Sequence, residues 1–182
     1  MNHFKLTNET KVFYNTTLYR IEATVDIVSI GVKKGDKGGF IEKESNLHDQ
    51  AWVYGDARVF GNARVFGNAC VYGDAWVFGN AWVFGNARVS DNAQVYGDAR
   101  VFGDARVYGD AHIDCASAIL WITLGGFYTA TITKKLIFIG CQKFTKKQIL
   151  KISKKDAINK GLPKEFADRY RAMIIAAMKL VK

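Results

Sequence analysis

The sequence predicts a mainly β protein, in which a solenoid of stacked six-residue units is followed by a small, lysine-rich α+β domain. Thirteen aliphatic residues recur every six positions from Ile41 to Ile113, without an insertion. Between residues 51 and 110 most units read Ala-x-Val-aromatic-Gly-Asp/Asn. A period this strict indicates units that stack, each burying one side against the next.

Each unit is expected to form one short strand and one corner. In Ala-x-Val-aromatic, alanine and valine point to one side of a strand, and x and the aromatic residue point to the other. The Gly-Asp or Gly-Asn pair tolerates the backbone angles of a corner. The x positions hold Trp, Arg, Cys, Gln and His, which cannot share one buried slot. We therefore expect valine and alanine in a narrow core, and the other side chains outside.

The two ends of the repeat are expected to differ. Residues 1–40 cap the first coil, because its backbone groups would otherwise be unpaired, and residues 11–28 alternate like a hairpin with its turn at 15–17. The repeats fill 41–114, and residues 115–182 form the α+β domain. Its expected elements are strands at 118–124, 127–133 and 135–140, a helix at 145–156 with Thr145 as N-cap, and a helix from near Pro163 with the apolar stripe Phe166, Tyr170, Met173, Ile174, Ala177, Met178 and Val181.

The charge is uneven along the chain. The whole sequence carries 26 basic and 17 acidic residues, a net charge of +9, but residues 134–182 hold fourteen Lys and Arg against three acids, a net charge of +11. Such a basic segment suits nucleic acid or another anionic partner. A lysine-rich surface that only contacts water has the same composition.

The cysteines and the apolar segments indicate a cytoplasmic protein. Cys70, Cys115 and Cys141 are widely spaced and form no CxxC pair, which is typical of a reducing compartment. The first residues lack an apolar leader segment. The apolar stretch 115–132 contains two adjacent glycines, so we interpret it as buried strands rather than a membrane span.

The repeat resembles the hexapeptide repeat of left-handed parallel β-helix proteins over residues 41–114. The shared pattern is an aliphatic residue with a small residue four positions later, from Val53 with Ala57 to Val107 with Ala111. The resemblance implies a left-handed β-helix with three units per triangular coil. It departs from many members in placing Tyr or Phe after the aliphatic residue. The flanking segments, including residues 33–42, resemble uncharacterised phage and prophage proteins, which implies a viral origin and a bacterial host cytoplasm.

Three units per coil place every eighteenth residue in one column and give three outer faces. The first face displays Arg58, Trp76, Gln94 and His112 beside Phe60, Phe78 and Tyr96. The second face displays Arg64, Trp82 and Arg100 beside Phe66, Phe84 and Phe102. The third face displays Trp52, Cys70, Arg88 and Arg106 beside Tyr54, Tyr72, Ser90 and Tyr108. Three aromatic ladders are more apolar surface than a lone chain usually exposes. The resemblance implies a homotrimer that covers one face, and the alternative is that the flanking segments cover the ladders.

The sequence offers little catalytic chemistry. His3, His48 and His112 are its three histidines, and their spacing does not suggest a shared metal. An acyltransferase of the hexapeptide class that uses His112 or His48 as general base is one alternative function. The recurring Asp and Asn fit corner geometry better than calcium binding. We expect no cofactor and no metal.

The candidate binding residues combine guanidinium groups with aromatic rings. On the third face, Ser90-Asp91 replaces an aromatic residue and its glycine, which predicts a notch between Tyr72 and Tyr108 with Arg88 and Arg106 at its rim. The other interpretation of this unit is sequence drift at a tolerant position. A rival site on the second face is Trp82 between Arg64 and Arg100. Such sites suit planar anions, because guanidinium pairs with phosphate and rings stack on bases.

The function that these features favour is non-enzymatic binding. We expect a phage-type protein that sequesters a nucleotide immune signal of the host, or blocks a host defence protein, through these sites at the trimer interfaces. The alternatives are the acyltransferase and a scaffold whose basic C-terminal domain binds nucleic acid. A membrane partner is not expected.

Overall fold

The computed structural model describes residues 2–114, 119–124, 128–133, 136–139, 142–160 and 171–181. Cys115, Cys141 and the expected helix start near Pro163 lie outside these residues, as do Phe166 and Tyr170 of the expected stripe. The chain divides into two compact units, Met1–Ala116 and Ser117–Lys182. The first holds the N-terminal segment and the repeats, and the second holds the lysine-rich segment.

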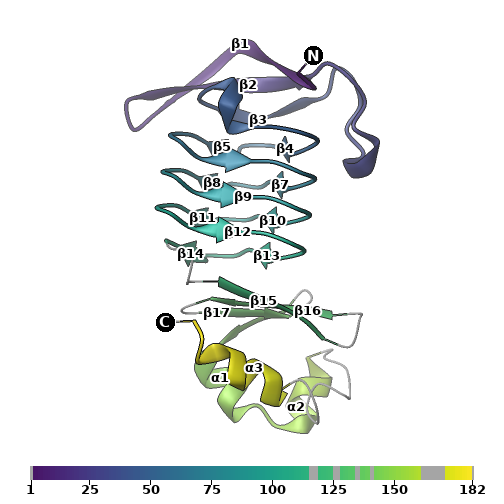
Figure 1. Ribbon diagram of the computed structural model, residues 1–182, viewed down its shortest axis with the longest axis vertical. Coiled ribbons are helices and arrows are strands. Elements are labelled where there is room, and N and C mark those ends of the chain that lie inside the picture. Colours follow the sequence, from purple (N-terminus) through teal and green to yellow (C-terminus); the bar gives the residue numbers. More distant parts are fainter. Residues whose placement is uncertain are drawn as a thin grey trace. The chain divides into compact units, whose positions relative to one another are not determined.

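The N-terminal segment folds into a hairpin that extends the solenoid. Strands β1 (Phe4–Phe13) and β2 (Thr16–Ala23) pair antiparallel, and β2 pairs with β3 (Lys37–Ile41), which is also the first parallel strand of the repeat. The hairpin turns at Tyr14 and Asn15, both in the left-handed region with φ of 45° and 60°. The expected turn at 15–17 is therefore slightly too late in the chain. Along the chain, the short helix η1 (Val28–Ile30) follows β2 and precedes β3, and Figure 1 shows the arrangement of β1, β2 and β3.

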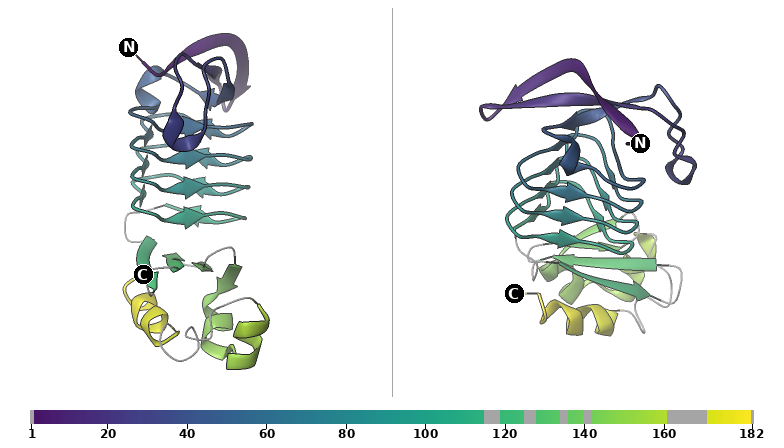
Figure 2. Two further views of the ribbon diagram at one scale, coloured as in Figure 1. Left: turned by 90° about the vertical axis from the view of Figure 1, so that its right-hand side faces the viewer. Right: turned by 45° about the horizontal axis from the view of Figure 1, so that its top comes forward.

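The repeats form a parallel β-solenoid of about four turns. After β3 and the short helix η2 (Glu44–Asn46), its two-residue strands are β4 (Trp52–Val53), β5 (Arg58–Val59), β6 (Arg64–Val65), β7 (Cys70–Val71), β8 (Trp76–Val77), β9 (Trp82–Val83), β10 (Arg88–Val89), β11 (Gln94–Val95), β12 (Arg100–Val101), β13 (Arg106–Val107) and β14 (His112–Ile113). Each pairs with the strand one coil away, as Val59 does with Val77 and Val77 with Val95. The expected stacking of every eighteenth residue is thus confirmed (Figure 2).

The three columns of strands correspond to the three expected faces. The first face is the sheet β3-β5-β8-β11-β14, the second is β6-β9-β12 and the third is β4-β7-β10-β13. The repeat valines and alanines between them are completely buried or nearly so, and Ile41 and Ile113 are buried with them. The prediction of a narrow Val/Ala core is confirmed. Small side chains suit it because strands of three sheets face one another across a short distance.

The corners are linked by a second set of contacts. In two corner columns the side-chain amide of one coil donates a hydrogen bond to the side chain at the same corner of the next coil. In the first column Asn62 donates to Asn80 at 3.3 Å, and Asn80 donates to Asp98 at 3.1 Å. In the second column Asn68 donates to Asn86 at 3.2 Å, and Asn86 donates to Asp104 at 3.0 Å. A third column repeats this from Asn92 to Asp110 at 3.3 Å. The recurring Asx residues therefore shape the corners and also bond the coils, since such ladders give each polar side chain a partner.

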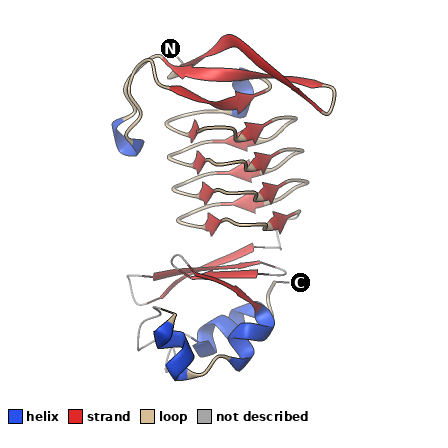
Figure 3. Ribbon diagram, turned by 180° about the vertical axis from the view of Figure 1, so that it is seen from behind, coloured by secondary structure: helices blue, strands red, loops and turns tan. Residues whose placement is uncertain are grey.

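The C-terminal unit is an antiparallel sheet with helices on one side. Its strands, in sheet order, are β15 (Ile119–Leu124), β16 (Tyr128–Thr133), β17 (Leu136–Ile139) and β18 (Gln142–Thr145), and its helices are α1 (Lys146–Lys151), α2 (Lys154–Asn159) and α3 (Arg171–Met178) (Figure 3). Residues of β16, β17, β18 and all three helices share one apolar cluster, which includes Phe144, Ile149 and Ile174. Each helix thus buries one stripe against the sheet.

Three details of this unit differ from the expectations. Strand β18 was not expected. The helix predicted at 145–156 is broken, because Ser153 accepts a hydrogen bond from the Asp156 backbone N–H and starts α2 as a new helix. Thr145 caps α1 as predicted. Ile174 and Ala177 of the apolar stripe are buried, but Met173 is half exposed and does not belong to the core.

Candidate functional site

The second face carries an unbroken stack of phenylalanine rings. Phe66 and Phe84 stack at 4.8 Å between ring centroids with an interplanar angle of 1°, and Phe84 and Phe102 stack at 5.4 Å and 17°. The first face has a similar ladder, in which Phe60 and Phe78 stack at 5.1 Å. Rings fall into register because successive coils repeat at the spacing of β-strands.

The tip of the N-terminal hairpin covers part of the first face. The Phe13 ring meets Phe60 at 5.7 Å and Trp76 at 4.7 Å, both edge to face. The Arg58 guanidinium lies 4.8 Å from the Phe13 ring and 5.6 Å from the Trp76 ring. On this face the alternative expectation, that a flanking segment covers the ladder, describes the structure. The two ring contacts of Phe13 are apolar, so they bury surface that water would otherwise meet.

The N-terminal segment also covers the start of the third face. Trp52 and Cys70 were expected on display, but both are buried. The His3 ring lies 6.3 Å from the Trp52 ring, and His3 Nε2 donates to the Ala51 carbonyl at 3.0 Å. Burial lowers the pKa of His3, so that the ring is neutral at pH 7. Periodicity could not reveal this cover, because the covering residues lie outside the repeat.

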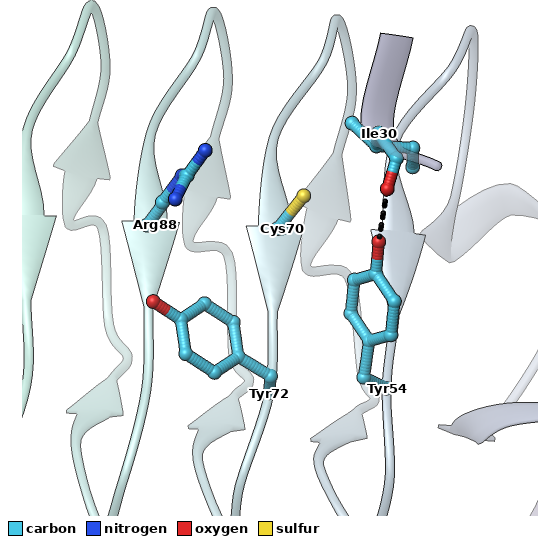
Figure 4. A pocket seen from close by; sticks show the side chains of 5 residues that line it. All are labelled: Ile30, Tyr54, Cys70, Tyr72 and Arg88. Atoms are coloured by element: carbon cyan, nitrogen blue, oxygen red, sulfur yellow. Dashed lines mark hydrogen bonds between the residues drawn. The ribbon is translucent and has the colours of Figure 1, made fainter. Parts of the chain in front are cut away.

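The notch predicted at Ser90 is not formed as expected. Ser90 is buried, and Tyr72 lies edge-on to Tyr54 at 6.5 Å and 88° instead of stacking. Figure 4 shows the Tyr72 ring directed toward the coil that carries Arg88, which is also the coil of Ser90. At the corner, Asp91 takes a φ of 58°, and its carboxylate accepts from the Gly109 N–H at 2.9 Å.

A pocket of about 380 Å³ lies beside this position, and we call it the loop pocket. It is lined by Ile30, Tyr54, Cys70, Tyr72 and Arg88. Of the residues expected at the notch, Arg88 and Tyr72 line the loop pocket, whereas Ser90, Arg106 and Tyr108 do not. Ile30 belongs to η1 in the non-repeating segment, so no periodicity pointed to it.

The rival site on the second face has the expected geometry. The Trp82 ring lies between two guanidinium groups, that of Arg100 at 4.9 Å and that of Arg64 at 5.9 Å from its centroid. We call these three residues the arginine–tryptophan column. Both arginines are exposed, and Phe66 meets the Trp82 ring edge-on at 6.0 Å. Each cation over a ring contributes roughly 0.5–1 kcal/mol at such a site.

A shallow pocket of about 320 Å³ opens beside the column. It is lined by Arg64, Phe66 and Trp82 together with His48 and Asp49, which belong to the preceding coil. His48 is exposed, and its Nε2 donates to the Ser45 carbonyl at 3.0 Å. The Asp49 carboxylate accepts from the Gly67 N–H at 2.9 Å, so it is already engaged. His48 and Asp49 were not expected at this site, although the eighteen-residue register places His48 directly above Phe66.

The alternative chemistries, a histidine base or a bound metal ion, have little support among the described residues. His112 is exposed, and its ring lies 6.5 Å from the Tyr96 ring. Within the described ranges, no three His, Cys, Asp or Glu side chains lie close enough together to hold a metal ion. None of the helices described is long and apolar enough to cross a membrane.

Comparison with known proteins agrees with the architecture. The family model of the YdcK β-solenoid repeat matches residues 57–73, 81–97, 93–109 and 99–113. No curated protein is similar enough to the chain to count as a match. The matched segments lie inside the parallel solenoid, and together with its stacked strands they identify the chain as a protein built on a repeating β-solenoid.

Proposed function

We propose that this protein binds a nucleotide without transforming it, and that the arginine–tryptophan column on the second face is the binding site. The observation that carries the proposal is the position of Trp82 between Arg64 and Arg100, at 5.9 and 4.9 Å. A planar ring flanked by two cations offers a stacking surface for a base and charge for a phosphate.

The surroundings of the column support a ligand with two or more negative charges. Both guanidinium groups are exposed, and neither forms a salt bridge within the described part of the chain. The Asp49 carboxylate nearby is held by a backbone N–H. The hairpin and η1 contact the other two faces, so among the described residues the second face offers the most accessible ladder. Base stacking on one aromatic ring contributes about 1–3 kcal/mol.

The wider biological setting is part of the same proposal. We propose that the solenoid is a left-handed hexapeptide helix, that three copies assemble into a homotrimer, and that the ligand is a nucleotide signal of a bacterial defence system. The resemblance of the flanking segments to phage proteins supports the last point. A trimer would close the shallow pocket beside the column with a neighbouring subunit, which would deepen a site that one chain leaves open.

The test is titration calorimetry with linear and cyclic nucleotides on four proteins: the unchanged chain, Arg64→Met/Arg100→Met, Trp82→Leu, and Arg88→Met as a matched control on the third face. We expect the double arginine variant and Trp82→Leu each to weaken binding at least tenfold, because a phosphate partner or the stacking ring is lost. Arg88→Met should bind as the unchanged chain does. Equal binding by all four proteins would contradict the proposal.

Two further measurements separate binding from the alternative functions. The ligand recovered after denaturation should be chemically intact, whereas an acyltransferase would turn over acyl-CoA and lose activity in His112→Ala or His48→Ala. Mass photometry of the unchanged chain gives the number of copies in the assembly. If the protein is a monomer and still binds the nucleotide, the nucleotide part of the proposal stands and the trimer part is wrong.

A second candidate function is nucleic-acid binding by the C-terminal unit. Lys147 and Lys151 on α1, and Lys154 and Lys155 on α2, are all exposed. Four cations on two consecutive helices suit a phosphate backbone, and such binding weakens steeply as salt rises. An electrophoretic shift with duplex DNA or RNA that disappears in a variant with these four lysines changed to Gln would support it. Arginine–tryptophan column variants should leave that shift unchanged.

A further inference from the structure

The loop pocket is separate from the arginine–tryptophan column and lies on the third face. Its walls come from four different coils or segments: Ile30 of η1, Tyr54, Cys70 with Tyr72, and Arg88. Its volume of about 380 Å³ falls within the usual range for small-molecule sites. Figure 4 shows the Tyr54 and Tyr72 rings turned in different directions, with Cys70 and Arg88 on neighbouring strands beside them.

The pocket results from two features that meet at the same place, a missing ring in the aromatic column and the docking of the η1 loop on the solenoid. The column Tyr54, Tyr72, Ser90 lacks a third ring, so Tyr72 has a ring neighbour in its column on one side only, and it lies edge-on to that neighbour, Tyr54. The Tyr54 hydroxyl donates to the Ile30 carbonyl at 3.2 Å, which joins the loop of η1 to the solenoid. The two rings therefore form a corner rather than a flat stack, and the η1 loop closes one side of it.

The charges that line the pocket are few and simple. Arg88 is the only charged residue among the five described residues that line it. Burial raises the pKa of Tyr54 to about 12, with the nearby Cys70 thiol as the next cause, and burial raises the pKa of the Cys70 thiol as well. At pH 7 the hydroxyl and the thiol are neutral, so the pocket offers one positive charge on otherwise aromatic and apolar walls.

This chemistry selects among anions. One guanidinium pairs well with one carboxylate through two parallel hydrogen bonds. A doubly charged phosphate would keep part of its charge uncompensated against apolar walls, which is costly. The edge-to-face rings accept a flat apolar body, because aromatic groups pack well in such a corner. The column on the second face differs in both respects, since it has two guanidinium groups and an exposed surface.

We propose that the loop pocket binds a small monocarboxylate with a flat apolar body, with Arg88 holding the carboxylate and Tyr54 and Tyr72 holding the ring. Cys70 packs beside the ligand as a neutral side chain. This site is independent of the nucleotide site, and neither requires the other to be correct.

Cys70 supplies a direct readout of occupancy. In a Cys115→Ser/Cys141→Ser background the only thiol is Cys70, and its rate of modification by methyl methanethiosulfonate is measured by mass spectrometry. The probes are benzoate and indole-3-acetate, compared with their neutral amides and with adenosine monophosphate. We expect a carboxylate to slow modification at least fivefold, and its amide to have little effect.

The variants assign the effect to the pocket. Arg88→Met should abolish protection by the carboxylates, whereas Arg106→Met, one coil away on the same face and outside the pocket lining, should preserve it. Both arginines are exposed, so neither change should disturb folding. Protection that is equal for acid and amide, that survives Arg88→Met, or that is strongest with adenosine monophosphate would overturn the proposal, as would no protection by any probe.

Discussion

The second and third faces of the solenoid share one backbone repeat and one set of inward valines and alanines, yet their outer surfaces differ. On the second face three phenylalanines stack in register, and the Phe66 and Phe84 rings are parallel within 1°. On the third face Ser90 interrupts the column, and Tyr72 lies at 88° to Tyr54. One missing ring therefore changes the orientation of its neighbour and opens a pocket, while the buried Val89 beneath it keeps its place in the core.

The comparison shows that core and surface are specified separately in this fold. The core varies little, with Ile or Leu in place of Val only near its ends at Ile41, Leu47 and Ile113, because opposing strands leave little room between them. The outer columns are held by ring stacking of about 0.5–1.5 kcal/mol per pair, which is too weak to alter the coil but strong enough to orient side chains. Binding surfaces can thus differ between faces without a change in architecture.

The largest expected effect on stability comes from placing a serine in the aromatic column of the second face, as Ser90 already stands in that of the third face. Phe84→Ser should lower the free energy of unfolding by about 2 kcal/mol, because it removes a ring that stacks on two neighbours and the apolar area that this ring buries. Phe102→Ser removes a ring with one described stacking neighbour and should cost about half as much. Urea denaturation measures both values. Equal losses would mean that stacking does not hold the column.

An intermediate effect is expected at the corners, where aspartate twice replaces glycine. Gly85 has a φ of +74°, and an added Cβ would lie 3.0 Å from the Gly103 nitrogen. Gly85→Ala should therefore cost about 1–2 kcal/mol of stability. Gly85→Asp should cost about 1 kcal/mol less, because Asp49 and Asp91 adopt this geometry and accept from the Gly67 and Gly109 N–H groups at 2.9 Å.

Thermal and urea denaturation of the two Gly85 variants compare the corners directly. A lower stability for the aspartate variant than for the alanine variant would show that the carboxylate-to-backbone bonds at Asp49 and Asp91 do not offset the strained backbone.

The smallest expected effect comes from repairing the third face. Ser90→Tyr restores a ring between Tyr72 and Tyr108 and should raise the free energy of unfolding by less than about 1 kcal/mol, since new stacking is offset by the movement of Tyr72. The same variant should remove the carboxylate protection of Cys70, because Tyr72 leaves the loop pocket. A stability loss of more than 1 kcal/mol, or unchanged protection, would show that Ser90 is not the cause of the Tyr72 orientation.

The repeat made most of the solenoid predictable, but the contacts of the segments outside the repeat could not be predicted. Strict six-residue spacing was enough to assign the core side, the eighteen-residue register and the position of Trp82 between two arginines. The cover over Trp52, the Phe13 contact on Trp76 and the wall formed by Ile30 depend on long-range packing of residues that follow no period. The edge-on orientation of Tyr72 was also missed, because alternation gives the side of a strand on which a residue lies and not its rotamer.

The hydrogen-bonded corner columns run in one direction. The Asn62 amide donates to Asn80, the Asn80 amide donates to Asp98, and the row of donors ends there because a carboxylate accepts hydrogen bonds and does not donate them. Asp104 and Asp110 occupy the same position in their columns. In the columns of Asn62 and Asn68 the acids therefore end the row of side-chain hydrogen bonds, whereas the third column already begins with Asp56 and Asp74. A lengthened solenoid would keep all three rows by duplicating the coil of Asn80, Asn86 and Asn92, whereas a copied coil of Asp98 and Asp104 would place new carboxylates against one another.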